Sequence, residues 1–477
     1  MPGCKRNSSD CVRIGCASAF WGDTAVSTPQ LLEASPRPDY IVYDYLSEIT
    51  MSLLARAKRR DPDKGGFCQD FITKHMAGNW KSLRQKGVKV VSNAGGLNPL
   101  ACAEAVRSLA TADGQSTLNV AAILGDDLLL SNGSVADDGL SYSSANVYLG
   151  AHSSPSTGAD VVITGRCVDS ALTLGPLMHE LNWAKEDLAA MAVGSLAGHL
   201  IECGAQATGG ICTDWEKLAH SWHNIGFPIV SFQRGQSLHF NLSKPANTGG
   251  VVTVGTVAEQ LVYEIGDPCA YALPDVTLDM SQVELKVDGR DSVLVQAAIG
   301  RKPPTQLKAT ATYADGYRAT AVVPVIGPKA ARKAILSAEA ILKRCEEIFA
   351  QLGLGSFSRS CVSPLGSGAS YGHVHLDDPN VKEVVLWLAV EHKSKNALEI
   401  FASEIAPAAT GMAPGLTTII GGRPKVSPVL RHKSYQVPRD VVQAQVYLNG
   451  ALIHSIPATL PTTFKQVHIK HLPLKTQ

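Results

Sequence analysis

Short apolar segments alternate with helix-patterned segments through the first 180 residues, and this alternation constrains the fold more than any other feature. The apolar segments are Val12–Ala17, Tyr40–Tyr45, Val88–Val91, Asn119–Leu124 and Asp160–Thr164. Strands and helices that alternate at this spacing predict βαβ units and a mostly parallel sheet. Because the predicted strands are continuously apolar, we expect helices to cover both faces of that sheet.

The pattern changes at about residue 225. Period-two segments between Gly, Pro and Asp-Gly turns predict antiparallel strands there, among them Gly250–Val257, and Lys329–Leu352 is predicted as a long helix. Asn449-Gly450 lies between two apolar runs and indicates a hairpin. We therefore expect an α/β domain with a parallel sheet over 1–224, a mixed α+β domain with antiparallel strands over 225–436, and a hairpin-like tail over 437–477.

Composition excludes several classes of protein. The chain has 43 Lys and Arg against 42 Asp and Glu, so it lacks the basic excess that nucleic-acid binding requires. Its apolar runs are shorter than a membrane-spanning helix, and the N-terminus has no signal-peptide core. The 11 cysteines are scattered without C-x-x-C pairs, which is typical of reduced thiols. We expect a cytoplasmic homo-oligomer that contacts neither nucleic acid nor membrane.

In a parallel sheet, ligands bind beyond the carboxyl ends of the strands, so residues after each apolar segment are candidates. The turn that contains Asn93, Gly95 and Gly96 precedes a predicted helix and is suited to hold an anion or a carbonyl group. The alternative is a tight turn that needs glycine only for its backbone conformation. The turn matches neither G-x-G-x-x-G nor a P-loop, and we expect no nucleotide cofactor.

Arg166 and Asp169 follow the predicted strand Asp160–Thr164. A buried arginine requires an anionic partner, and two partners are open: the carboxylate of a substrate, or Asp169 in an internal salt bridge. Asp126 and Asp127 have a similar position after another strand. Paired carboxylates can bind a metal ion, but no third ligand is defined by spacing.

His199 and Glu202 lie three residues apart on a predicted helix and therefore share one face. The helix leads into Gly204–Gly210, which we expect to be a flexible loop, with Gln206 available for substrate. A histidine and a glutamate in this position are suited to general acid–base catalysis. The alternative is a solvent-facing pair before a glycine-rich helix end.

Other histidines give no metal site. His373 and His375 would point to one face if they lay on a strand, but no third ligand can be identified for them or for His220 and His223. We therefore predict no metal and no cofactor.

Four longer motifs carry a resemblance. Ser92–Pro99 (SNAGGLNP), Thr164–Asp169 (TGRCVD), Ala197–Gly210 (AGHLIECGAQATGG) and Glu259–Val276 (EQLVYEIGDPCAYALPDV) resemble the acyclic terpene utilisation protein A (AtuA-like) family, a former domain of unknown function. The resemblance covers about residues 12–430. The resemblance implies a role in pathways that degrade citronellol- and geraniol-type terpenes through acyl-CoA thioesters. Many relatives add a small ferredoxin-like domain, and because this chain ends at Gln477 we expect a stand-alone form similar to those of fungal secondary metabolism.

Two functional hypotheses follow. The first is an enzyme of the hydratase, lyase or isomerase type that acts on a small or branched, terpenoid-like carboxylic acid or acyl-CoA thioester. In it, His199, Glu202 and Asp169 are catalytic, and five residues bind the substrate: Asn93, Gly95, Gly96, Arg166 and Gln206. The second is a non-catalytic accessory subunit of an acyl-CoA carboxylase or terpene-degradation pathway. The enzyme hypothesis requires that the polar residues at the strand ends meet in one pocket, and the accessory-subunit hypothesis does not.

Overall fold

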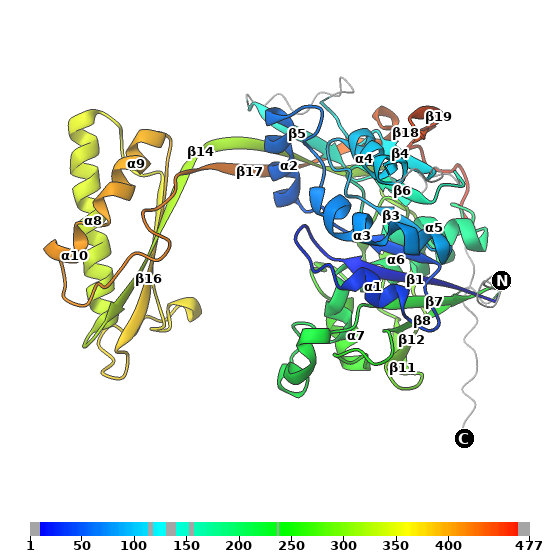
Figure 1. Cartoon of the computed structure of the whole chain (residues 1–477), viewed down its shortest axis with the longest axis horizontal. Helices are drawn as coiled ribbons and strands as arrows, with labels where there is room; N and C mark the ends of the chain where they lie inside the picture. Colours follow the sequence, from blue (N-terminus) through cyan, green and yellow to red (C-terminus); the bar gives the residue numbers. More distant parts are fainter. Residues whose placement is uncertain (1–9, 113–117, 130–139, 152–156, 236–237, 466–477) are drawn as a thin grey trace. The chain divides into compact units, whose positions relative to one another are not determined.

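The computed structural model describes residues 10–112, 118–129, 140–151, 157–235 and 238–465, which form two compact units (Figure 1). Unit 1 comprises the chain up to Thr312 together with the chain from His432 onward, and unit 2 comprises Tyr313–Arg431. No described helix has the length and apolar character needed to cross a membrane.

The predicted parallel sheet is confirmed in unit 1. Its five central strands lie in the order β1-β2-β3-β6-β4, and all four neighbouring pairs are parallel. Their bounds are β1 Cys11–Ser18, β2 Tyr40–Tyr43, β3 Lys89–Ser92, β4 Val120–Leu124 and β6 Val161–Thr164. Because the strands share one direction, the residues that follow them meet at one edge of the sheet.

Helices cover both faces of this sheet, as the apolar strands predict. Alternate residues of β2 enter different cores: Ile41 and Tyr43 face one layer of helices, and Val42 faces the other. The first layer is α1 Ser27–Leu32, α2 Glu48–Arg60, the π-helix Phe71–Met76, α3 Ala77–Gln85 and α4 Pro99–Thr111. The second contains α5 Ala171–Leu181 and α6 Leu188–Glu202. Residues 188–201 of α6 are all buried, so this helix is a central core element.

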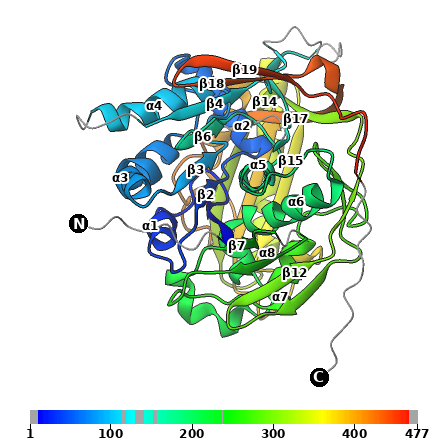
Figure 2. The ribbon, with the colours of Figure 1, turned by 90° about the vertical axis from the view of Figure 1, so that its right-hand side faces the viewer.

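Antiparallel strands extend the same sheet at both edges, giving eleven strands in the order β11-β12-β8-β7-β1-β2-β3-β6-β4-β18-β19. Figure 2 shows β18 and β19 beside β4. The added strands are β7 Ile229–Gln233, β8 His239–Ser243, β11 Glu284–Val287, β12 Ser292–Gln296, β18 Gln443–Leu448 and β19 Ala451–Pro457. The predicted tail hairpin is present as β18–β19, with residues 466–477 outside the described part.

The division of the chain differs from the expected boundaries at residues 224 and 436. Since β7 pairs with β1, the antiparallel strands after residue 225 complete the first sheet and do not begin a second domain. A period-two pattern identifies strands but not the sheet that they join, which explains the difference.

One predicted strand is wrong. Gly250–Val257 contains the start of helix α7, Val254–Leu261. Thr253 and Thr256 form a capping box: each hydroxyl accepts a hydrogen bond from the backbone N–H of the other. This reciprocal capping stabilises a helix N-terminus in a β-branched sequence that otherwise indicates a strand.

The remaining elements of unit 1 are short strands and 3₁₀ helices. Three short strands form a separate antiparallel sheet, β9 Tyr271–Ala272, β10 Thr277–Asp279 and β13 Ile299–Arg301. Strand β5, Tyr142–Val147, pairs with β14. Short 3₁₀ helices span Gly204–Thr208, Trp215–Lys217, Ala219–Asn224 and Arg439–Val441.

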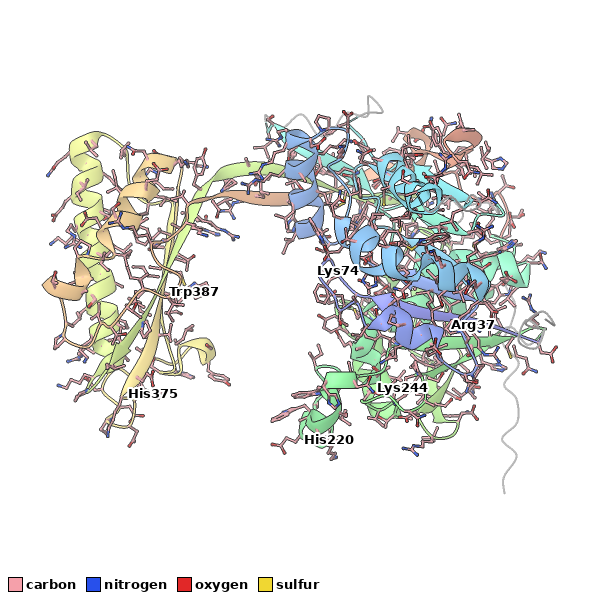
Figure 3. All side chains as sticks on the ribbon, viewed as in Figure 1. Arg37, Lys74, His220, Lys244, His375 and Trp387 are labelled. Carbon is pink, nitrogen blue, oxygen red and sulfur yellow. The ribbon has the colours of Figure 1, made fainter. Side chains whose placement is uncertain are left out.

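Unit 2 is a sheet with helices packed on one face. Strands lie in the order β15-β16-β14-β17, where β14 is Gln306–Ile326, β15 Arg359–Leu365, β16 Glu383–His392 and β17 Ser427–Pro438. The helices are α8 Ala330–Leu352, α9 Lys395–Glu404 and α10 Ala408–Gly411, with a 3₁₀ turn at Ala369–Tyr371. On the other face Trp387, labelled in Figure 3, is 42% exposed.

Candidate active site

Four of the predicted site residues meet at one cavity of unit 1. Arg166, Asp169, His199 and Glu202 all line a cavity of ≈ 850 Å³. Arg166 and Asp169 come from the segment after β6, and the other two come from the last turn of α6. The cavity therefore joins the carboxyl edge of the parallel sheet to the buried helix behind it.

His199 and Glu202 form a hydrogen-bonded pair in the cavity wall. His199 Nδ1 lies 3.1 Å from Glu202 Oε1, and His199 Nε2 lies 3.1 Å from the carbonyl oxygen of Leu261. A carbonyl oxygen only accepts hydrogen bonds, so Nε2 must carry a proton. The contact between Nδ1 and Oε1 then needs a further proton, which is held by either the imidazole or the carboxyl group.

The pKa values of the pair agree with a shared proton. Burial raises the pKa of Glu202 to about 7. Burial alone lowers the pKa of His199, but the hydrogen bond that the imidazolium donates to Glu202, the negative charge of that carboxylate and the nearby backbone carbonyl oxygens together outweigh burial and raise the pKa above the usual value. The pair therefore binds and releases a proton near neutral pH, where general acid–base catalysis is most effective.

The Arg166 guanidinium has an internal partner. Its Nη1 donates to Asp169 Oδ1 at 2.9 Å and to the carbonyl oxygen of Leu46 at 2.5 Å. Its central carbon lies 4.1 Å from the centre of the Tyr148 ring, a cation–π contact. The sequence left two partners open for Arg166, a substrate carboxylate and Asp169. The structure contains the salt bridge between Arg166 and Asp169.

Two residues that sequence reasoning missed, Tyr148 and Lys308, form a second charged group on the cavity wall together with Glu48. The Tyr148 hydroxyl donates to Glu48 Oε1, and Lys308 Nζ lies 3.4 Å from the same oxygen and 4.7 Å from the centre of the Tyr148 ring. Burial opposes ionisation of Glu48, but the Tyr148 hydrogen bond and the nearby cations lower its pKa to about 2. Glu48 is therefore ionised at any physiological pH. Glu48 is the first residue of α2 and lies five residues after the end of β2.

The Asn93 turn has a packing role in the structure. Asn93 is buried, accepts from the Tyr45 N–H at 2.8 Å and donates to Asp44 Oδ1 at 2.6 Å. A Cβ on Gly95 would lie 2.5 Å from the Thr164 carbonyl oxygen, and one on Gly96 would lie 2.4 Å from a Leu54 methyl. Asn93, Gly95 and Gly96 are not among the described residues that line the cavity.

The segment Gly204–Gly210 differs from the flexible loop that its sequence indicates. Gly204–Thr208 is an ordered 3₁₀ helix, and Thr208 donates to the Ala205 carbonyl oxygen at 2.9 Å. Small residues suit both flexible loops and close packing, and here they pack closely. Gln206, within this helix, is not among the described residues that line the cavity.

Two buried carboxyl groups support the site from behind. Asp126 accepts from the Arg166 N–H and from Asn146 Nδ2, both at 2.8 Å, and burial raises its pKa to about 7. Asp126 therefore positions the Arg166 backbone. Burial also raises the pKa of Asp44 well above its usual value.

The histidine motifs do not form a metal centre in the described structure. His373 and His375 lie in an exposed loop and not on the strand that their spacing suggested, and His220 is exposed in a 3₁₀ helix (Figure 3). Among the described residues, no three His, Cys, Asp or Glu side chains are arranged to hold a metal ion.

Comparison with known proteins identifies the family. The family model of the acyclic terpene utilisation family protein AtuA matches residues 12–448. The chain belongs to this family. Except for Cys11 at the start of β1, the match covers the five parallel strands, and it covers every residue of the cavity named above, so the site lies within the part that defines an AtuA-like protein. A search of the curated proteins finds no match to the chain.

Proposed function

We propose that this AtuA-like protein is an enzyme that moves a proton at the carbon next to the carbonyl group of a branched, terpenoid-like acyl thioester. Such a step belongs to a hydration, dehydration or isomerisation. The observation that carries the proposal is the His199–Glu202 pair, whose second proton lies at the wall of a cavity of ≈ 850 Å³. A cavity of this size accommodates an organic substrate.

In this proposal the carboxylate of Glu202 accepts the proton from carbon. His199 stabilises both the ionised and the protonated form of Glu202 through its Nδ1 atom. The Leu261 carbonyl oxygen holds the imidazole ring in place through Nε2. The electrons of the broken C–H bond move to the carbonyl oxygen, where the Arg166 guanidinium and the Lys308 ammonium are suited to stabilise negative charge. Return of the proton to a different carbon completes an isomerisation, and loss of a hydroxide leaving group as water completes a dehydration.

Charge favours a thioester over a free acid. The described residues that line the cavity include four carboxyl groups, Glu48, Asp169, Glu202 and Glu264, and two permanent cations, Arg166 and Lys308. Both cations are already paired, with Asp169 and Glu48. Because the carboxyl groups outnumber these cations, a substrate carboxylate would be repelled in the ground state, whereas the carbonyl oxygen of a thioester is uncharged and gains charge beside the cations only as the proton leaves.

Deuterium exchange in D₂O tests the proposal, with 3-methylbutanoyl-CoA and its free acid as matched probes. We expect the wild-type protein to exchange deuterium into the thioester, measured by NMR, and the Glu202→Gln variant to be slower by ~10²–10⁴-fold, as for loss of a general base. The exposed residue Glu104, on α4, gives the matched control Glu104→Gln, which should retain the wild-type rate.

Equal rates for Glu202→Gln and the wild type would contradict the assigned role. Faster exchange of the free acid would contradict the choice of a thioester. If the wild-type protein binds the thioester, seen as a raised melting temperature, but exchanges no deuterium, the non-catalytic accessory role is supported instead.

A further inference from the structure

Tyr271 lies on the cavity wall beside the acid–base pair and takes no part in the proton transfer described above. It belongs to β9, where it pairs with Leu278 of β10 in an antiparallel ladder. The centre of its ring is 5.8 Å from the centre of the His199 ring, and the two planes meet at 62°, an edge-to-face contact. The ring also packs against the core that contains α6. Strand pairing and ring contacts therefore fix the position of Tyr271.

The Tyr271 hydroxyl is a polar group without a partner in the described part of the chain. Four polar side-chain atoms of the described residues are buried without a hydrogen-bond partner, and this hydroxyl is not one of them, so it reaches the open space of the cavity. Two other hydroxyls of the wall differ: Tyr148 donates to Glu48, and the hydroxyls of Tyr435 and Tyr142 are bonded to each other. Tyr271 thus offers the cavity a hydrogen bond that no described residue uses.

The surroundings of Tyr271 keep its proton in place. Burial raises the pKa of the hydroxyl, and the carboxyl groups of Glu202, Asp169 and Glu264 raise it further. The group is therefore a neutral O–H donor at any physiological pH and cannot serve as a base.

The chemistry proposed for the pair requires such a donor near Glu202. When a base removes a proton from the carbon next to a carbonyl group, negative charge develops on the carbonyl oxygen, which is only two bonds from that carbon. Arg166 and Lys308 are already paired with Asp169 and Glu48, so they act on this oxygen mainly through their charge. An unused O–H group on the same wall is suited to a direct hydrogen bond, which strengthens as the charge develops.

We infer that the Tyr271 hydroxyl donates a hydrogen bond to the carbonyl oxygen of the acyl thioester and stabilises the enolate that forms when Glu202 removes the proton. In this step the C–H electron pair becomes the carbon–carbon double bond, and the π pair of the carbonyl group moves to its oxygen. The proton from carbon lies on Glu202, and Tyr271 keeps its own. The role in the reaction rests on the proposed function, whereas the hydrogen bond can be measured without turnover.

The Tyr271→Phe variant of the full-length chain tests the role, because it removes one oxygen atom and keeps the ring. With 3-methylbutanoyl-CoA in D₂O we expect deuterium exchange to be slower by about 10²-fold, as for loss of one oxyanion donor. The affinity for the thioester, measured by calorimetry, should fall by less than about tenfold, because a neutral hydrogen bond contributes little in the ground state. The melting temperature should not change. Tyr371, in unit 2 and 87% exposed, gives the matched control Tyr371→Phe, which should behave as the wild type.

Isotope-edited infrared spectroscopy of the bound thioester, labelled with ¹³C at its carbonyl group, measures the hydrogen bond itself. We expect a lower carbonyl stretching frequency in the wild type than in Tyr271→Phe, because a hydrogen bond polarises the C=O bond. Equal frequencies would overturn the inference, and so would equal exchange rates in an active wild type; in both cases the exchange rate of Glu202→Gln still tests the proposed function by itself.

An inactive wild type separates the two proposals in the other direction. If the wild type binds the thioester but exchanges no deuterium, the proposed function fails, and a carbonyl frequency that depends on Tyr271 still supports the hydrogen bond. A wild type that does not bind the thioester would overturn both. Slower exchange with a lowered melting temperature and an unchanged frequency would assign Tyr271 a structural role and overturn the inference.

Discussion

The environment of Arg166 shows how one buried charge organises the site. The side chain is 5% exposed, and its contacts are the Asp169 carboxylate, the Leu46 carbonyl oxygen and the Tyr148 ring. Its own backbone N–H is held by Asp126. Because a buried guanidinium is stable only when its donors are satisfied, these contacts fix the position of the loop after β6.

Replacement of Arg166 by alanine should therefore reduce stability as well as activity. It leaves the Asp169 carboxylate without its cation, and we expect a loss of about 3 kcal/mol in the free energy of unfolding, the lower end of the range for broken buried pairs. The lower end applies because Asp169 is 31% exposed. Urea unfolding measures the loss, and Arg107→Ala, which breaks a solvent-exposed pair with Glu104, should change stability by less than about 0.5 kcal/mol. Equal effects of the two substitutions would show that the Asp169 pair contributes little to stability and leaves Arg166 available to substrate.

The sequence predicts the residues of the site that follow from local rules. Arg166 and Asp169 were located by their place after an apolar strand, and His199 and Glu202 by helical spacing. Leu261 and Lys308 could not be predicted, because they come from segments about 60 and 140 residues further along the chain than His199 and Arg166. Local patterns identify the groups that carry chemistry, whereas the partners that orient them depend on tertiary structure.

At the scale of elements, the turn between β3 and α4 shows how a glycine-rich motif can serve packing. Gly95 lies against the backbone of the residue that ends β6, with space for a hydrogen but not for a methyl group. Two parallel strands can then lie side by side while the chain turns into a helix. The same pattern, Asn followed by small residues after a strand, is also typical of anion-binding turns, so sequence alone could not distinguish the two roles.

Alanine substitutions at two glycines should have opposite effects. Gly95→Ala places a methyl group 2.5 Å from the Thr164 carbonyl oxygen and should destabilise the protein by about 1–3 kcal/mol, as overpacking does. Gly78 lies inside α3 with open space around it, so Gly78→Ala should stabilise the protein by about 0.5–1 kcal/mol through helix propensity. Thermal and urea unfolding measure both. A stable Gly95→Ala variant would show that the turn can move and would restore it as a candidate ligand-binding turn.

At the scale of the whole molecule, segments that are far apart in the sequence belong to the same structural unit. Strands from both ends of the sequence complete the large sheet of unit 1, and unit 2 is inserted between Thr312 and His432. The sequence predicts most strands of the large sheet and the long helix of unit 2, but not this arrangement, because β14 and β17 each begin in one unit and end in the other. A long strand gives no compositional sign of a domain boundary within it.

Deletion of unit 2 tests this organisation. β14 and β17 are hydrogen-bonded neighbours, so an Asn-Gly turn can join Thr312 to His432 in place of residues 313–431. Every residue that lines the acid–base cavity remains, and we expect the shortened protein to fold and to exchange deuterium into the acyl thioester within about tenfold of the full-length rate. Circular dichroism melting shows whether it folds. A shortened protein that folds but exchanges no deuterium would contradict the assignment of the acid–base site to unit 1 alone, and one that does not fold would show that unit 1 depends on the inserted residues for stability.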